Sequence, residues 1–153
     1  MKNLYLFLLI PLLSVAQTNQ DISQLSRYDV AEGLRIQNDI RHFYELEPYT
    51  IDGKLSLKAQ EWANHLARTN EFEHSDDELG EIIYSVGRIY ADNKNLNLLK
   101  DASLYWLLTK CELDGEDAPY LQIISKRATK IGFGVAMNME EYFVVAKYDS
   151  IYL

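Results

Sequence analysis

The segment Glu71-Phe72-Glu73-His74-Ser75-Asp76-Asp77-Glu78-Leu79-Gly80-Glu81 decides how this chain of 153 residues is interpreted. It places one histidine, His74, seven positions before a glutamate, Glu81, in a polar and acidic stretch. Imidazole nitrogen and carboxylate oxygen serve as metal ligands and as the groups of acid/base catalysis. The segment therefore indicates a functional loop, whose partners must come from the rest of the chain.

Hydrophobic periodicity on both sides of this loop predicts a fold of the α+β class. Apolar residues spaced as on one helical face lead up to the loop, and Ser56 is expected to be the N-cap of that helix. The alternation around Gly132 and Gly134 indicates a strand with close backbone packing. Helices and strands that segregate along a chain are typical of layered α+β folds. The expected elements are helices over 28–46, 56–67 and 98–110, strands over 81–90, 131–137 and 142–148, a polar link over 91–97, and a segment over 120–126 that is either a short helix or a strand.

The first sixteen residues have the pattern of a signal peptide. Lys2 provides a positive start, residues 4–15 form an apolar run broken by Pro11, and Ser14-Val15-Ala16 matches a cleavage site. The apolar run is shorter than the roughly 20 residues of a membrane-spanning helix. We therefore expect cleavage after residue 16, export, and no stable membrane insertion of the mature chain.

The charge and the single cysteine limit the possible partners. The chain has 15 basic and 23 acidic side chains, a formal charge of −8, and loss of Lys2 on cleavage leaves −9. This field repels phosphate backbones, so nucleic acid is not an expected partner. Cys111 has no second cysteine to pair with, and its place after an apolar helical segment favours a partly buried, inert thiol over a covalent dimer.

Several short motifs occur in order along most of the mature chain. They are Gln37-Asn38-Asp39-Ile40-Arg41, Ala59-Gln60-Glu61-Trp62-Ala63, His74-Ser75, Gly80-Glu81, Gly132-Phe133-Gly134 and Val144-Val145-Ala146-Lys147-Tyr148. Together, from about Leu34 to Tyr148, they resemble the CAP superfamily of cysteine-rich secretory proteins, antigen 5 and pathogenesis-related proteins of class 1. The resemblance implies a three-layer α-β-α sandwich with a small antiparallel sheet. Together with the signal peptide pattern, the resemblance divides the chain into a signal peptide (1–16), a lead-in with the start of the first helix (17–33) and a CAP-like domain (34–153).

The resemblance also implies a central site of which this chain retains half. Many CAP domains gather two His and two Glu in a cleft that can hold zinc. His74 and Glu81 match two of these positions. Alignment on Trp106 puts Thr109 at the second glutamate, and alignment on the closing hairpin puts Pro119 at the second histidine. We therefore expect a degenerate cleft of His74, Glu81, Thr109 and Pro119 that holds no metal and no other cofactor.

The resulting hypothesis is a secreted CAP-like protein that acts by binding and not by catalysis. The resemblance implies a protein partner or a small apolar ligand such as a lipid or sterol, outside the cell or in the periplasm of a bacterium. The alternative is a metal-binding protein, hydrolytic or not, that uses His74 and Glu81 with nearby loop carboxylates. An inert structural or toxin-like module stays open as a third reading. Ser75 beside His74 does not predict a nucleophile and its base, because adjacency in sequence does not create that geometry.

Overall fold

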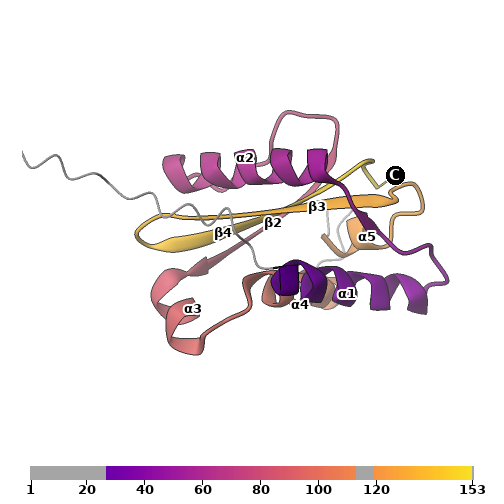
Figure 1. Ribbon diagram of the computed structural model, residues 1–153, viewed down its shortest axis with the longest axis horizontal. Coiled ribbons are helices and arrows are strands. Elements are labelled where there is room, and N and C mark those ends of the chain that lie inside the picture. The colour runs from indigo at the N-terminus through magenta and orange to yellow at the C-terminus, as the bar shows by residue number, and fades with distance from the viewer. Residues whose placement is uncertain (1–26, 113–118, 153) are drawn as a thin grey trace, which may run out of the picture.

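The computed structural model describes residues 27–112 and 119–152 and arranges them in three layers (Figure 1). One face of a four-stranded sheet is covered by α2 (Gly53–Thr69). The other face is covered by α1 (Arg27–Phe43), α4 (Leu98–Glu112) and the short α5 (Pro119–Ile123). The expectation of a three-layer α+β sandwich is confirmed. The expected signal peptide (1–16) lies outside the described residues, as does the side chain of Cys111.

The sheet is mixed, with the strand order β1-β3-β4-β2. β4 (Glu141–Tyr148) pairs antiparallel with β3 (Lys130–Met137), as the sequence predicts, and also with β2 (Gly80–Gly87). β1 (Thr50–Ile51) pairs parallel with β3 at the edge. The sequence analysis did not anticipate β1, because two residues are too few to show an alternating pattern.

Helix α2 begins earlier than the sequence predicted, so the assignment of Ser56 as its N-cap is wrong. Asp52 is the N-cap, and its carboxylate accepts hydrogen bonds from the backbone N–H groups of Lys54 and Leu55 at 2.9 and 3.0 Å. A side-chain oxygen at this position satisfies N–H groups that have no partner within the helix. Ser56 lies inside the first turn, and its hydroxyl donates to the Asp52 carbonyl at 2.9 Å.

The segment after β2 is helical where a strand and a polar link were expected. β2 ends at Gly87, and α3 (Arg88–Lys94) follows, closed by Asn95 with a left-handed φ of 49°. Ile89 and Tyr90, which led to the longer strand, are 78% and 57% exposed on this helix. These two side chains therefore lie at the surface and are not part of a buried strand. Residues 119–123 form α5, which resolves the open assignment over 120–126 as a short helix.

The alternation along the strands decides which side chains face which layer. The core cluster with α2 contains Ile83 and Val145, and the cluster with α1 and α4 contains Ile82 and Tyr148. By the same period of two, Glu81 on β2 belongs to the α2 face. The two glycines of β3 allow α2 to pack closely, since a Cβ on either would lie 2.1 to 2.3 Å from backbone atoms of α2.

Candidate functional site

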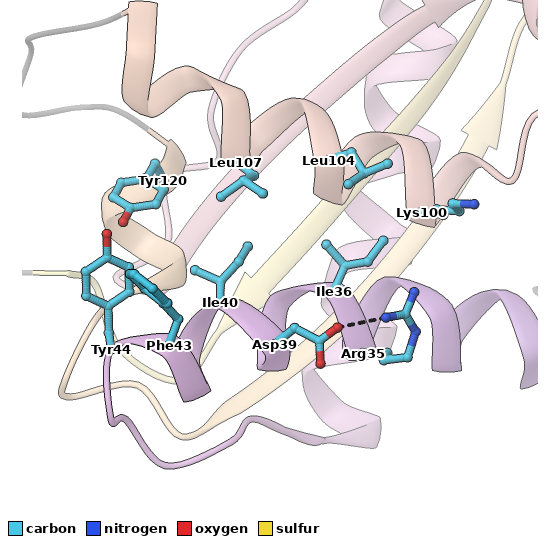
Figure 2. A pocket seen from close by; sticks show the side chains of 10 residues that line it. All are labelled: Arg35, Ile36, Asp39, Ile40, Phe43, Tyr44, Lys100, Leu104, Leu107 and Tyr120. Carbon is cyan, nitrogen blue, oxygen red and sulfur yellow. Dashed lines mark hydrogen bonds and ion pairs between the residues drawn. The ribbon is translucent and has the colours of Figure 1, made fainter.

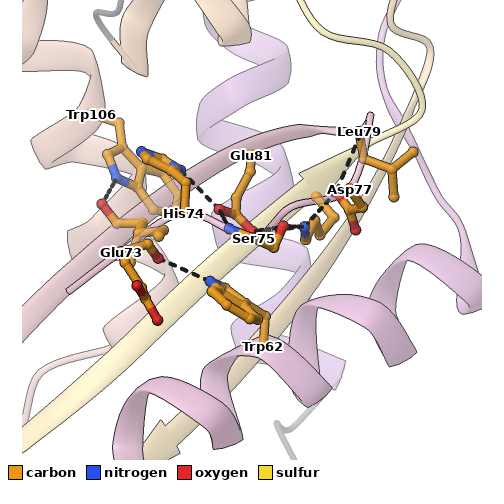
Figure 3. Close-up of polar contacts among 10 residues, drawn as sticks. Trp62, Glu73, His74, Ser75, Asp77, Leu79, Glu81 and Trp106 are labelled. Carbon is orange, nitrogen blue, oxygen red and sulfur yellow. Dashed lines mark hydrogen bonds and ion pairs between the residues drawn. The ribbon is translucent and has the colours of Figure 1, made fainter. Parts of the chain in front are cut away.

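The carboxylate of Glu81 is held at the start of β2 by the preceding loop (Figure 3). His74 Nδ1 lies 2.8 Å from Glu81 Oε1, and the backbone N–H of Ser75 donates to the same oxygen at 3.0 Å. The Ser75 hydroxyl donates to Oε2, also at 3.0 Å. The side chain of Glu81 is 5% exposed and that of His74 is 67% exposed. The structure thus joins the two predicted residues directly, with the imidazole at the surface and the carboxylate beneath it.

Lys147 completes this cluster from the adjacent strand. It is the register partner of Glu81 in the β2–β4 pair, and its ammonium lies 2.7 Å from Glu81 Oε2. The same nitrogen lies 2.9 Å from Asp77 Oδ1 and donates to the Ser75 hydroxyl. Its side chain is 1% exposed. A buried charge needs such partners, because an ion removed from water without them is strongly destabilising. Lys147 is not among the site residues that the sequence predicts.

Both carboxylates of the cluster are ionised at neutral pH. Burial acts to raise the pKa of Glu81, but hydrogen bonds from His74, Lys147 and the Ser75 backbone together lower it below its ordinary value. The pKa of Asp77 is also lowered, because the bond and charge of Lys147 outweigh the effect of burial. Glu81 is therefore not suited to act as a general acid near pH 7, which requires a raised pKa.

The contact between Ser75 and Lys147 does not form a nucleophile with its base. A base must accept the hydroxyl proton, whereas an ammonium ion-paired with two carboxylates donates to Ser75. The Ser75 hydroxyl donates in turn to Glu81. The arrangement is one of fixed donors and acceptors that hold a loop against a strand.

A second set of contacts fixes the same loop to α2. Trp62 Nε1 donates to the Glu73 carbonyl at 3.1 Å (Figure 3). The indole also stacks on His65 with ring centroids 4.4 Å apart. His65 Nε2 lies 3.3 Å from Glu73 Oε1. The loop is thereby attached to α2 before His74 and to the sheet after it.

Thr109 and Pro119 lie in the layer on the other side of the sheet. Thr109, on α4, is 4% exposed. Its hydroxyl donates to the Trp106 carbonyl at 2.6 Å and accepts from the Tyr120 backbone N–H at 3.2 Å. Pro119 is the first residue of α5. These contacts join α4 to α5, whereas His74 and Glu81 join the loop to β2, so the grouping of all four in one cleft stays a prediction.

The described residues do not supply a metal-binding set. Over residues 27–112 and 119–152, no three His, Cys, Asp or Glu side chains gather in a way that could hold a metal ion. Zinc takes about four ligands, or three with water. His74 and Glu81 bind one another, and the second oxygen of Glu81 is taken by Lys147.

A separate pocket of about 540 Å³ opens between α1 and α4 (Figure 2). Its walls are apolar side chains of the two helices, and its ends differ. At one end the rings of Tyr44 and Tyr120 lie edge to face with centroids 6.2 Å apart. At the other end Arg35 is ion-paired with Asp39 at 2.7 Å, near Lys100. The sequence does not predict this pocket, and none of the four predicted cleft residues lines it. The lining residues are Arg35, Ile36, Asp39, Ile40, Phe43, Tyr44, Lys100, Leu104, Leu107 and Tyr120.

The protein is an α-β-α sandwich in which the loop before β2 and the start of that edge strand form a polar cluster. A family model, the cysteine-rich secretory protein family (CAP), matches residues 34–148, and the chain belongs to this family. Members are generally extracellular proteins that bind proteins or lipids and do not catalyse reactions. Within the part of the chain that the structure describes, no helix combines the length and apolar character needed to cross a membrane.

Solved structures show the same fold at low sequence identity. BmVAL-1 has a TM-score of 0.68 at 18% identity, over 82% of this chain and 78% of that one. NaASP2, solved with Zn²⁺, has a TM-score of 0.65 at 18% identity, over 81% and 80%. Venom allergen-like protein 4 of Schistosoma mansoni gives 0.56 at 15% identity, over 81% and 86%. No curated protein sequence matches significantly.

Proposed function

We propose that this chain is a secreted binding protein without catalytic activity, and that it takes a small apolar molecule in the pocket between α1 and α4. The pocket carries the proposal, because its volume of about 540 Å³ is that of a site for a small molecule. Its floor is formed by buried apolar side chains, of which Ile36 is 7% exposed, Ile40 is 9% exposed and Tyr120 is 5% exposed.

The rim of the pocket supports a ligand that is apolar along most of its length. Phe43 and Leu104 are 79% and 38% exposed there, so a bound apolar molecule would remove their surface from water. Removal of apolar surface from water is worth about 25 cal/mol per Å². Lys100 and the Arg35–Asp39 ion pair stand at one end, where they would accommodate a polar head.

The absence of catalysis is proposed from the chemistry of the polar cluster. Glu81 is held ionised, the Ser75 hydroxyl donates a hydrogen bond to Glu81, and Lys147 is paired with carboxylates. These residues therefore provide neither an acid nor an activated nucleophile.

A zinc-binding function is the second candidate, because the similar protein NaASP2 was solved with Zn²⁺. The residues of this chain do not fit that ion. Thr109 is occupied by backbone partners and Pro119 has no donor atom, while the ammonium of Lys147 lies 2.7 Å from the one carboxylate of the remaining pair. Zinc titration followed by calorimetry tests this: saturable micromolar binding that disappears in His74→Ala would favour the metal function.

The ligand proposal is tested by fluorescence titration of the mature chain with two probes, dehydroergosterol for a sterol and cis-parinaric acid for a fatty acid. Leu107→Trp fills the pocket from α4 and should weaken binding of the preferred probe at least about tenfold. Leu57→Trp is the matched control, because Leu57 is 67% exposed on α2, across the sheet. If neither probe binds saturably, or both variants bind like the wild type, the pocket is not the binding site.

Secretion is proposed from the signal peptide pattern and from the family. It is tested by mass spectrometry of the protein expressed from its full sequence with export machinery present. A mature chain that begins at Gln17 supports it, and an uncleaved chain retained in the cell contradicts it.

A further inference from the structure

Lys147 is a buried cation in contact with Glu81, one of the two residues expected from the resemblance to be metal ligands. We propose that its ammonium group takes the place of a divalent cation in this chain. The oxygens around it are then already bound to a positive charge, and a metal ion does not bind there. This inference does not depend on the ligand proposed for the α1–α4 pocket. It starts from the poor fit of zinc to the residues present.

The first observation is the coordination of the ammonium. An ammonium has three donors, and Lys147 Nζ has three oxygen partners: Glu81 Oε2 at 2.7 Å, Asp77 Oδ1 at 2.9 Å and the Ser75 hydroxyl. Carboxylate and hydroxyl oxygens are also the ligands of hard divalent cations. The oxygens therefore converge on one cationic centre, which the chain itself supplies.

The second observation is how the sheet builds this place. Lys147 is the register partner of Glu81 on β2 and of Gly132 on β3. Gly132 has no side chain, and α2 packs against it so closely that a Cβ would lie 2.1 Å from the Ser56 nitrogen. The lysine side chain is thus confined between α2, β2 and the loop, where it is 1% exposed.

The third observation is what the ammonium connects. Ser75 and Asp77 belong to the loop, Glu81 belongs to β2, and Lys147 lies on β4. One cation consequently joins three segments of the chain, which is what a structural metal ion does. A divalent cation at the same oxygens would have to displace the ammonium or lie beside a like charge that is out of contact with water.

The test compares two lysines that contact the same carboxylate. Lys58, on α2, lies 3.7 Å from Asp77 Oδ2, and its side chain is 52% exposed. Lys147→Met removes the buried cation, and Lys58→Met is the matched control. Thermal melts and calorimetry are run on each mature chain with zinc, with calcium and with EDTA, and also on His74→Ala.

We expect the wild type and Lys58→Met to melt at the same temperature under all three conditions. Lys147→Met should melt at a lower temperature, and zinc or calcium should raise that temperature by binding at least about tenfold more tightly than to the wild type. The rise should disappear in the double variant Lys147→Met/Glu81→Gln. Two results overturn the proposal: saturable metal binding by the wild type that His74→Ala abolishes, or Lys147→Met behaving like Lys58→Met.

If Lys147→Met does not fold, the double variant keeps the proposal testable. Removal of one member of a buried ion pair leaves an unpaired charge, whereas removal of both does not. Lys147→Met/Glu81→Gln should then fold and melt above Lys147→Met. A double variant that is no more stable than Lys147→Met contradicts the replacement of a cation.

Discussion

Replacement of Arg41 should destabilise this fold far more than replacement of an exposed helical arginine. Arg41 lies on α1, is 1% exposed, and donates to four backbone carbonyls. Its guanidinium carbon also lies 3.7 Å from the centroid of the Tyr49 ring. The carbonyls belong to Glu47 at 2.6 Å, Ile123 at 2.9 Å, Ser125 at 2.8 Å and Ala128 at 3.1 Å.

The magnitude follows from what the side chain leaves behind. Arg41→Ala would leave four carbonyls without this donor, and three of them belong to the buried residues Ile123, Ser125 and Ala128. Hydrogen bonds to a charged donor contribute about 1.5–3 kcal/mol each but do not add fully. We therefore expect Arg41→Ala to lower the free energy of unfolding by about 4 kcal/mol. For a chain of this length that is a fall of about 10 °C in the melting temperature.

Arg41→Lys separates the charge from the geometry. Lysine keeps the positive charge, but its three donors leave from one nitrogen and cannot span four carbonyls or lie flat on an aromatic ring. We expect it to lose about 2 kcal/mol, roughly half the effect of alanine. If charge alone mattered, Arg41→Lys would be as stable as the wild type.

The assay is urea unfolding of the mature chain, followed by tryptophan fluorescence and by far-ultraviolet circular dichroism. Arg68, exposed on α2, provides the matched controls Arg68→Ala and Arg68→Lys. A loss below about 1 kcal/mol for Arg41→Ala, or a loss equal to that of Arg68→Ala, would refute the reasoning.

Three further predictions concern stability. The pKa of Glu81 in the folded protein lies below the ordinary value of 4.5, so the ionised carboxylate stabilises the fold above pH 4.5, and this stabilisation is lost as the pH falls through the folded pKa. Glu81→Gln should therefore unfold at a lower urea concentration than the wild type at pH 7. A difference between the two that is as large at pH 3 would contradict this. Gly134→Ala would place a Cβ 2.3 Å from the carbonyl carbon of Ala59, so thermal melts should show a loss of about 2 kcal/mol, and an unchanged melting temperature would show that α2 can move away. Trp106→Phe would remove the 3.0 Å bond from the indole to the Ile83 carbonyl and should lose about 1–3 kcal/mol in urea unfolding. A variant as stable as the wild type would contradict this.

The sequence predicted the elements whose apolar residues form a continuous pattern. The face of α2 and the closing hairpin are examples, because each buries one side against a partner with a regular period. The pairing of His74 with Glu81 could also be expected from the sequence, since the loop that contains His74 leads directly into the strand that contains Glu81. The start of α2 was misplaced because both Asp52 and Ser56 are residues that cap helices, and only the geometry shows which one accepts the bonds.

The role of Lys147 could not be predicted in the same way. Its neighbours Val145 and Tyr148 indicate a buried strand, but a lysine in such a run has no visible partner until the register of the sheet is known. That register places it opposite Glu81, 66 positions earlier in the chain. Pairing over such a distance depends on how the strands meet, which local pattern does not specify.

The pocket and the polar cluster lie on opposite sides of the sheet, and this separation bears on what each can do. The pocket is built from α1, α4 and α5, whereas Glu81 and Lys147 belong to the face covered by α2. Between them stand β2 and β4, which pair antiparallel over eight register positions from Gly80 to Gly87. A ligand in the pocket would therefore not touch the cluster. Ligand binding in the pocket and the stabilisation supplied by Lys147 are therefore separable properties. A substitution at either site can serve as the control for a substitution at the other.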